Sequence, residues 1–379
     1  MTAAFVSRPA PRLIFGPGTL RELPAAVRSL GGTGVFIVSD PGIARAGHLD
    51  RAARMLADAK IPAAVFSDSR ENPTESDAAA CRDAARAHRF DCLVALGGGS
   101  SLDTAKACNF LLSNGGAMHD YHGYGKAARP MLPLIAIPTT AGTGSETQSY
   151  ALISRDGSHE KMACGDPKAL PAVAILDPEL TATLPHGAAL LSGVDALTHA
   201  VESAVCTKAN ALSAAYAESA FRAIAGAIDR VVDGRATDDD RARMLLGAAL
   251  AGLAIENSML GAAHASANPL TARLGVVHGR AVATMLPPVM RFNATVPAAA
   301  ATYGRLSAIL RELGVTDRPA VEWVEALVAR CRFPALDRTT DLAVLADDAT
   351  RQWTGKFNPR PLQAGDFVSL YRRVFGLET

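Results

Sequence analysis

The sequence has no CxxC pair and no regular spacing among its cysteines. A small disulfide-stapled protein or a cysteine-ligated zinc module would show one or the other. The pattern therefore favours reduced thiols in a reducing compartment over a disulfide framework. The six scattered cysteines are Cys81, Cys92, Cys108, Cys164, Cys206 and Cys331.

An excess of charge of either sign is also missing, because 38 Lys and Arg balance 37 Asp and Glu over 379 residues. This balance argues against nucleic acid and against an anionic membrane surface as partners. No segment reaches the roughly 18 uninterrupted apolar residues of a membrane span, and residues 1–15 lack the layout of a signal peptide. We expect a soluble, cytoplasmic protein, and the length suits two domains.

Short apolar runs alternate with helical patterns over residues 1–184, which favours a parallel sheet joined by helical crossovers. From about Pro185 onward, long alanine- and leucine-rich stretches with helical periodicity take over. We therefore expect an α/β, Rossmann-like domain over 1–184 and an all-helical domain over 185–379. The expected strands cover 13–15, 35–38, 63–66, 92–96, 134–137, 150–154 and 172–176. The expected helices of the second domain cover 188–206, 209–231, 240–265, 297–313, 318–331, 340–353 and 364–375.

Two loops at strand ends carry the features of a phosphate-binding site, although the sequence has neither G-x-G-x-x-G nor a Walker A motif. The first is Gly97-Gly98-Gly99-Ser100-Ser101, where missing Cβ atoms and a helix N-terminus would suit a pyrophosphate. The second is Pro138-Thr139-Thr140-Ala141-Gly142-Thr143-Gly144-Ser145, which follows another strand. Ligands of open α/β sheets bind at such ends. The alternative for the first loop is a tight strand-to-helix turn.

Two charged residues could extend this cofactor site. Asp40, at the end of the strand 35–38, could accept hydrogen bonds from an adenosine ribose and repel a 2′-phosphate, or it could be a turn or cap residue. Lys161 could reach a ribose or phosphate, or it could be a solvated surface lysine.

A carboxylate and three histidines predict a metal site. Asp195 and His199 are four residues apart in an apolar helical run, so both leave one helix face. His264 and His278 follow in a segment almost free of charge. One carboxylate and three imidazoles suit a borderline divalent ion such as Fe²⁺ or Zn²⁺. The alternative is a set of separately satisfied histidines.

These motifs, in this order, resemble those of the iron-containing (group III) alcohol dehydrogenase family. The resemblance rests on Gly97–Ser100, on 138–146, on Gly193–His199 and on Val277-His278-Gly279, and it runs the length of the chain. It implies a dehydroquinate synthase-like architecture, in which cofactor and metal lie between an α/β domain and a helical domain. It also implies a metal-dependent enzyme that interconverts alcohols with aldehydes or ketones by hydride transfer to or from NAD(H).

The resemblance implies roles for individual residues. Asp40 matches a position whose carboxylate favours NAD over NADP, and Lys161 matches a ribose contact. The implied catalytic and metal-binding residues are Asp195, His199, His264 and His278. The implied cofactor-binding residues are Asp40, Asn72, Gly97, Gly98, Gly99, Ser100, Asp103, Thr139, Thr140, Thr143 and Lys161.

One position departs from the family pattern. Four residues after His264 the family often has a histidine credited with proton relay, and here Asn268 cannot exchange a proton near neutral pH. Three alternatives stay open on the same fold: a dehydroquinate synthase-like lyase, a maleylacetate reductase-like enzyme, and a non-catalytic NAD- or metal-binding relative. The expected partner is a small alcohol or aldehyde, and we expect a homodimer because helical domains with apolar faces often self-associate.

Overall fold

A computed structural model of the chain describes residues 4–157, 161–337 and 341–377. The chain divides into two compact units. The sheet unit is Pro9–Leu184, and the helical unit is Pro185–Thr379 together with the described part of Met1–Arg8. Each unit is taken by itself below.

A six-stranded sheet, entirely parallel, forms the centre of the sheet unit, so the expected α/β fold with a parallel sheet is confirmed. Its inner strands are buried on both faces, as continuous runs such as Val35-Phe36-Ile37-Val38 require. In spatial order the strands are β1 (Arg12–Phe15), β9 (Val173–Leu176), β6 (Leu134–Pro138), β4 (Cys92–Gly97), β2 (Val35–Val38) and β3 (Ala63–Phe66).

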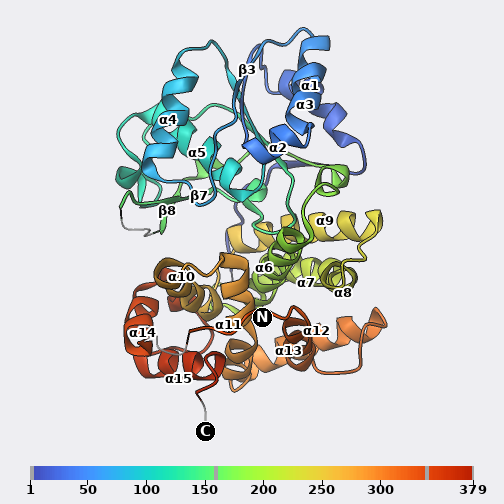
Figure 1. Cartoon of the computed structure of the whole chain (residues 1–379), viewed down its shortest axis with the longest axis vertical. Helices are drawn as coiled ribbons and strands as arrows, with labels where there is room; N and C mark the ends of the chain where they lie inside the picture. The colour runs from blue at the N-terminus through green and yellow to red at the C-terminus, as the bar shows by residue number, and fades with distance from the viewer. Residues whose placement is uncertain (1–3, 158–160, 338–340, 378–379) are drawn as a thin grey trace. The chain divides into compact units, whose positions relative to one another are not determined.

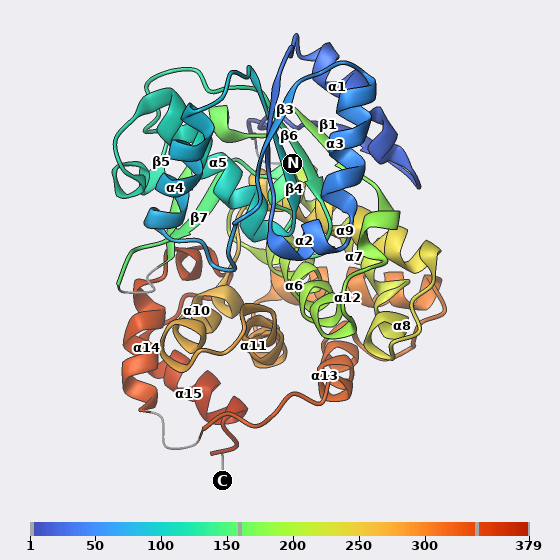
Figure 2. The same ribbon diagram turned by 45° about the horizontal axis from the view of Figure 1, so that its top comes forward.

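Helices cover both faces of this sheet (Figures 1 and 2). Alternate strand residues such as Ile37 and Val94 pack with α1 (Leu23–Ser29) and α3 (His48–Asp58) in one apolar core. The intervening residues, such as Phe36, pack with α4 and α5 in a second core on the opposite face. Helix α4 is Glu75–Arg86 and α5 is Gly99–Asn114. The period-2 alternation of each strand therefore supplies two cores.

A smaller three-stranded sheet lies beside α5 and is ordered β5 (Gly123–Tyr124), β8 (Lys161–Gly165), β7 (Tyr150–Ser154). The strand expected over 150–154 is present but belongs to this sheet, where it runs antiparallel to β8. The remaining short helices of the sheet unit are η1 (Thr19–Glu22), α2 (Pro41–Arg45), η2 (Met118–Tyr121), η3 (Ser145–Thr147), η4 (Pro167–Ala169) and η5 (Pro178–Thr181).

The described part of the helical unit consists of helices, as expected, but two of the expected boundaries are wrong. The run 240–265 is two helices separated at residues 257–261, and the run 209–231 is interrupted by Gly226. A helix over 278–293 was not expected. The helices are α6 (His186–Val205), α7 (Ala211–Ala225), α8 (Ile228–Val232), α9 (Asp238–Glu256), α10 (Ala262–Leu274), α11 (His278–Asn293), α12 (Pro297–Glu312), α13 (Ala320–Arg330), α14 (Leu342–Arg351), η6 (Trp353–Phe357) and α15 (Ala364–Val374).

The first residue of the helix expected over 340–353 lies outside the described residues. At the break after α9, the side-chain amide of Asn210, a residue from the start of α7, donates to the carbonyl of Asn257 at 2.7 Å. That contact satisfies a carbonyl that a continuing helix would have used. Across the described residues, no helix has the length and apolar character that a membrane span requires.

Candidate metal centre and cofactor-binding loops

Helix α6 places Asp195 and His199 one turn apart, both buried. The Nε2 atom of His199 lies 3.6 Å from Oδ1 of Asp195. Small apolar residues fill the middle of α6, so neighbouring helices can approach its backbone closely. The four-residue spacing thus brings the two side chains together on one face.

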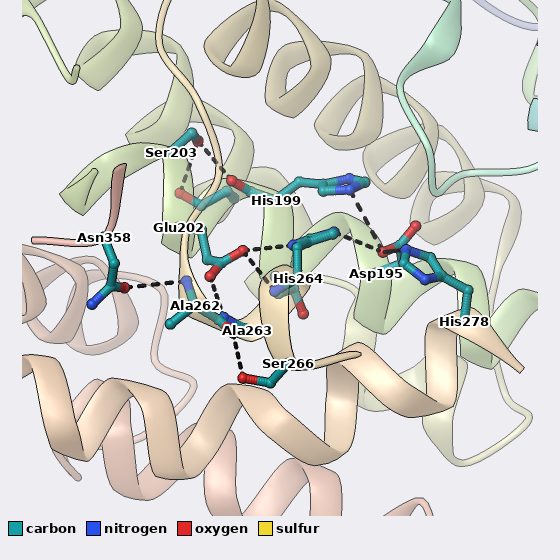
Figure 3. A network of polar contacts seen from close by, with 12 residues as sticks. Asp195, His199, Glu202, Ser203, Ala262, Ala263, His264, Ser266, His278 and Asn358 are labelled. Atoms are coloured by element: carbon teal, nitrogen blue, oxygen red, sulfur yellow. Dashed lines mark hydrogen bonds and ion pairs between the residues drawn. The ribbon is translucent and has the colours of Figure 1, made fainter. Parts of the chain in front are cut away.

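Helices α10 and α11 bring His264 and His278 to the same carboxylate (Figure 3). Their Nε2 atoms lie 3.6 and 3.9 Å from Oδ1 of Asp195. Gly279 makes the approach of α11 possible, because a Cβ there would lie 2.5 Å from the carbonyl oxygen of Leu191 in α6. All four residues predicted from the sequence therefore meet around one oxygen atom.

The donor set fits a cation. Asp195, His199 and His264 offer ligand atoms that all lie within 4.8 Å of one another. His278 also lies beside Asp195, and 26% of its side chain is exposed. Oδ1 of Asp195 and Nε2 of His264 are buried without a hydrogen-bond partner. Buried polar atoms left in this state are costly, and a divalent ion coordinated by both would remove that cost.

Charge interactions within the cluster outweigh burial. Burial alone would raise the pKa of Asp195, but His199, His264 and His278 hold it well below its usual range. Burial alone would lower the pKa of His264, but Asp195 and Glu202 raise it to about 9. With its pKa raised to about 9, His264 without a metal favours the charged form, with a proton on each ring nitrogen, and a metal at Nε2 must displace the proton there.

Glu202 is a fifth member of the cluster that the sequence analysis missed. Its Oε2 lies 2.5 Å from Nδ1 of His264, on the ring edge opposite Asp195. It is almost fully buried and lies on α6, three residues after His199. The available signal was the spacing 195, 199, 202, which places three polar side chains on one face of a helix rich in alanine, leucine and valine.

Asn268 lies on α10 one turn after His264 and is half-buried. Its Nδ2 donates to Oε1 of Gln352 at 2.9 Å, directly after α14. The position expected to carry a proton-relaying histidine thus holds an amide tied to another amide. Neither group titrates near neutral pH.

The sheet unit brings the two predicted cofactor loops into contact. A Cβ on Gly99 would lie 2.5 Å from Cγ2 of Thr143, and one on Gly98 would lie 3.3 Å from Cγ2 of Thr140. Thr139 donates its backbone N–H to the carbonyl of Gly97 at 3.0 Å. The glycines are therefore needed for the two loops to meet at the N-terminus of α5, where free N–H groups favour an anion.

Residues around this loop pair hold it in shape. Asn72 donates its backbone N–H to Oγ of Ser100 at 3.3 Å. Asp40 caps α2, accepting from the N–H groups of Gly42 and Ile43 at 2.9 and 3.1 Å, and it also accepts from Ser101 at 2.8 Å. The cap alternative raised for Asp40 is thus present in the structure, and its carboxylate lies beside the glycine loop.

Asp103 joins the start of α5 to the second loop and to β7. It is buried, accepts from Oγ of Ser145 at 2.7 Å, and accepts from the N–H of Leu152 at 3.2 Å. Burial raises its pKa, although the charges of Lys106 and Lys161 act in the opposite direction. Lys161 begins β8 and is half-buried. The four metal-ligand candidates lie in the helical unit, and all the cofactor-binding candidates lie in the sheet unit.

Comparison with known proteins gives matches to family models over almost the whole chain. Residues 10–178 match the model described as iron-containing alcohol dehydrogenase. Residues 189–375 match the model described as Fe-containing alcohol dehydrogenase family, C-terminal.

Individual relatives extend the likeness. The chain is 34% identical to alcohol dehydrogenase 4 of Schizosaccharomyces pombe over 351 residues, which cover 91% of this chain and 83% of that protein. It is 33% identical to the NAD-dependent methanol dehydrogenase of Bacillus methanolicus over 283 residues, or 75% and 74% of the two chains. Among solved structures, a 1,3-propanediol oxidoreductase superposes with a TM-score of 0.90 at 27% identity, covering 98% of this chain and 100% of that chain.

Proposed function

The chain belongs to the iron-containing alcohol dehydrogenase family and is an NAD-dependent oxidoreductase acting on CH–OH groups, and from this premise we propose that the cluster around Asp195 holds its divalent metal. The observation that carries this proposal is the convergence of three imidazole Nε2 atoms within 3.9 Å of one buried carboxylate oxygen. The proposed ligands are Asp195, His199, His264 and His278.

The charge of the ligand set suits alcohol chemistry. One carboxylate and three neutral imidazoles leave a divalent site with a net charge of about +1, which favours an alkoxide. When bound, the ion supplies Lewis acidity that polarises a carbonyl or lowers the pKa of an alcohol. The low pKa of Asp195 keeps its carboxylate ionised, and therefore available for coordination, throughout the neutral range.

We propose that the paired loops of the sheet unit bind NAD. Gly98 and Gly99 leave the backbone N–H groups at the start of α5 open to a pyrophosphate. The threonines of the second loop would border the nicotinamide, and Asp40 would disfavour the 2′-phosphate of NADP. The proposed cofactor contacts are Asp40, Asn72, Gly97, Gly98, Gly99, Ser100, Asp103, Thr139, Thr140, Thr143 and Lys161.

We infer that protons exchange through ribose hydroxyls and water. Asn268 and Gln352 hold each other by a hydrogen bond of 2.9 Å and neither can act as an acid or base near neutral pH. The side chains of this chain then contribute binding and orientation rather than general base catalysis.

For the substrate we propose a short, unphosphorylated alcohol or diol and the matching aldehyde. Relatives named for methanol and 1,3-propanediol support this class. The apolar run Ala262-Ala263-His264-Ala265-Ser266-Ala267 also supports it, because a phosphorylated substrate would call for clustered lysines and arginines.

The test is an anaerobic activity screen of protein reconstituted with Fe²⁺ or Zn²⁺, with NAD⁺ or NADH. Short linear alcohols, diols, aldehydes and hydroxy acids form the panel. We expect turnover on alcohols or diols and their aldehydes. Bound metal and bound NAD without turnover on any member would contradict the proposed function.

We also propose that the enzyme is a cytoplasmic homodimer. The six free cysteines, five of them buried, suit a reducing compartment. Light scattering of the purified chain tests the dimer, and a monomer at micromolar concentration would reject it.

A further inference from the structure

Helix α10 begins without a capping side chain of its own. Its N-cap residue is Gly261, whereas α7 and α9 begin with capping side chains from Asn210 and Thr237. The first N–H groups of α10 are instead satisfied from distant parts of the chain. Asn358 accepts from the N–H of Ala262 at 3.2 Å (Figure 3).

Glu202 supplies the rest of this remote cap. Its Oε1 accepts from the N–H of Ala263 at 2.6 Å, and its Oε2 lies 2.5 Å from Nδ1 of His264. Gly261 leaves room for it, because a Cβ there would lie 3.0 Å from Oε1 of Glu202. The negative charge also suits a helix N-terminus. One carboxylate therefore holds both the backbone of α10 and the ring of its histidine.

The surroundings of the two ring nitrogens of His264 determine which of them is available to a metal. A carboxylate only accepts hydrogen bonds, so the ring must carry its proton on Nδ1 to bond Glu202. The other nitrogen, Nε2, is buried 3.6 Å from Oδ1 of Asp195 and has no hydrogen-bond partner. A neutral imidazole with a proton on Nδ1 presents a lone pair at Nε2.

We propose that Glu202 is a positioning residue that keeps the proton of His264 on Nδ1 and thereby presents Nε2 to the metal. The inference rests on the proposed role of His264 as a ligand. Outer carboxylates of this kind fix the tautomer and the ring orientation of a ligating histidine. Glu202 does so from the helix that carries Asp195 and His199, so α6 controls three of the four proposed ligands.

The first experiment measures the dissociation constant of Zn²⁺ by chelator competition in Glu202→Gln. The single amide oxygen can accept a hydrogen bond from Ala263 or from His264 but not from both, because the NH₂ group only donates. We expect Zn²⁺ binding about 10- to 100-fold weaker than in the natural chain. The control is Glu256→Gln, which neutralises a buried carboxylate paired with Arg8 at 3.1 Å. Equal weakening in both variants, or none in a folded Glu202→Gln, would overturn the proposal.

The second measurement needs no variant and decides the case if Glu202→Gln does not fold. Long-range ¹H–¹⁵N spectra of zinc-loaded protein with ¹⁵N-labelled histidine report the protonated nitrogen of each ring. We expect His264 to carry its proton on Nδ1, and a proton on Nε2 would overturn the proposal. Natural protein that binds no stoichiometric Zn²⁺ would instead reject the metal site itself, so the two failures are distinguishable.

Discussion

At the residue scale, His264 and His278 differ in burial: the side chain of His264 is 5% exposed and that of His278 is 26% exposed. We expect His264→Ala and His278→Ala each to lose stoichiometric metal on desalting, since each removes an imidazole from the cluster. His264→Ala should also lower the metal-free stability by about 1–3 kcal/mol, because Glu202 then loses a buried partner. Metal analysis and thermal unfolding measure the two effects.

The matched control is His119→Ala, which removes a histidine that is 52% exposed in the sheet unit. That variant should keep its metal. Either cluster variant retaining one metal per chain and full activity would show that the ligand assignment is wrong.

Asp40 combines a structural contact with a proposed selective one. Asp40→Gly should shift the ratio of kcat/KM for NAD over NADP by about tenfold or more toward NADP, because the charge that repels the 2′-phosphate is gone; tenfold is about 1.4 kcal/mol. Asp40→Ser is the useful comparison, since serine still caps α2 but carries no charge. A shift in both variants assigns selectivity to the charge, and an unchanged ratio in both leaves Asp40 as a cap only.

At the element scale, the contact of α11 with α6 depends on Gly279. In Gly279→Ala the new Cβ would lie 2.5 Å from a backbone oxygen of Leu191, so the start of α11 must move and carry His278 with it. We expect a loss of about 1–3 kcal/mol in the free energy of unfolding and weaker metal binding. Denaturant unfolding and chelator competition provide the measurements.

Gly304→Ala is the matched control, because Gly304 lies inside α12 and a Cβ there meets no atom within 4 Å. It should stabilise the protein by about 0.5–1 kcal/mol and leave the metal unaffected. A Gly279→Ala variant that behaves like Gly304→Ala would contradict the packing argument.

A buried ammonium on α5, that of Lys106, and a buried carboxyl in η3, that of Glu146, lie at the loop after β6. Lys106 donates to the carbonyl and hydroxyl oxygens of Ser145 and to the carbonyl of Tyr150 at 2.6–2.9 Å. Glu146 is 1% exposed, its Oε1 has no hydrogen-bond partner, and burial raises its pKa to about 7. The folded state therefore favours the neutral carboxyl of Glu146.

The sign of the resulting pH dependence follows from this raised pKa. The stability contributed by Glu146 is complete below its ordinary pKa of 4.5 and is lost as the pH rises through about 7. Between pH 4.5 and pH 8 the free energy of unfolding of the natural chain should fall by up to about 3 kcal/mol, at about 1.4 kcal/mol per pKa unit. The Glu146→Gln variant should not show this fall. Urea unfolding at several pH values tests this, with the exposed Asp50→Asn as control. Parallel pH profiles for the natural chain and Glu146→Gln would contradict it.

Patterns within a single element could be predicted from the sequence, and contacts between elements could not. The strands over 35–38 and 63–66 were predicted at their observed bounds because their apolar runs are short and end at turn residues. Helix α11 was not predicted, since Pro287 and Pro288 inside it normally mark a boundary. The helix expected over 240–265 is broken where Asn210, a distant residue, takes a carbonyl.

The same division holds for the site. Asp195 and His199 were found from their four-residue spacing, which is a property of one helix. Glu202 was missed because its partners, Ala263 and His264, lie 61 and 62 residues away and belong to another helix. Asp40 was predicted as a strand-end carboxylate, but its contact with Ser101 needs two crossovers to be in place.

At the scale of the whole molecule, the proposed metal ligands all belong to the helical unit and the proposed NAD contacts all belong to the sheet unit. Each ligand stabilises the unit that binds it, by about 2.7 kcal/mol at a hundred times its dissociation constant. We therefore expect Zn²⁺ alone to slow amide hydrogen exchange in α6, α10 and α11. NAD⁺ alone should slow it at the start of α5 and in residues 138–145.

Hydrogen exchange with mass analysis measures both effects on one sample. His264→Ala is the internal control, because it should lose the zinc-dependent protection of α6, α10 and α11 and keep the NAD-dependent protection of the glycine loop. Zinc-dependent protection confined to the sheet unit would contradict the ligand assignment. Unchanged zinc-dependent protection in His264→Ala would also contradict it, because the variant lacks one of the side chains proposed to link these helices through the metal.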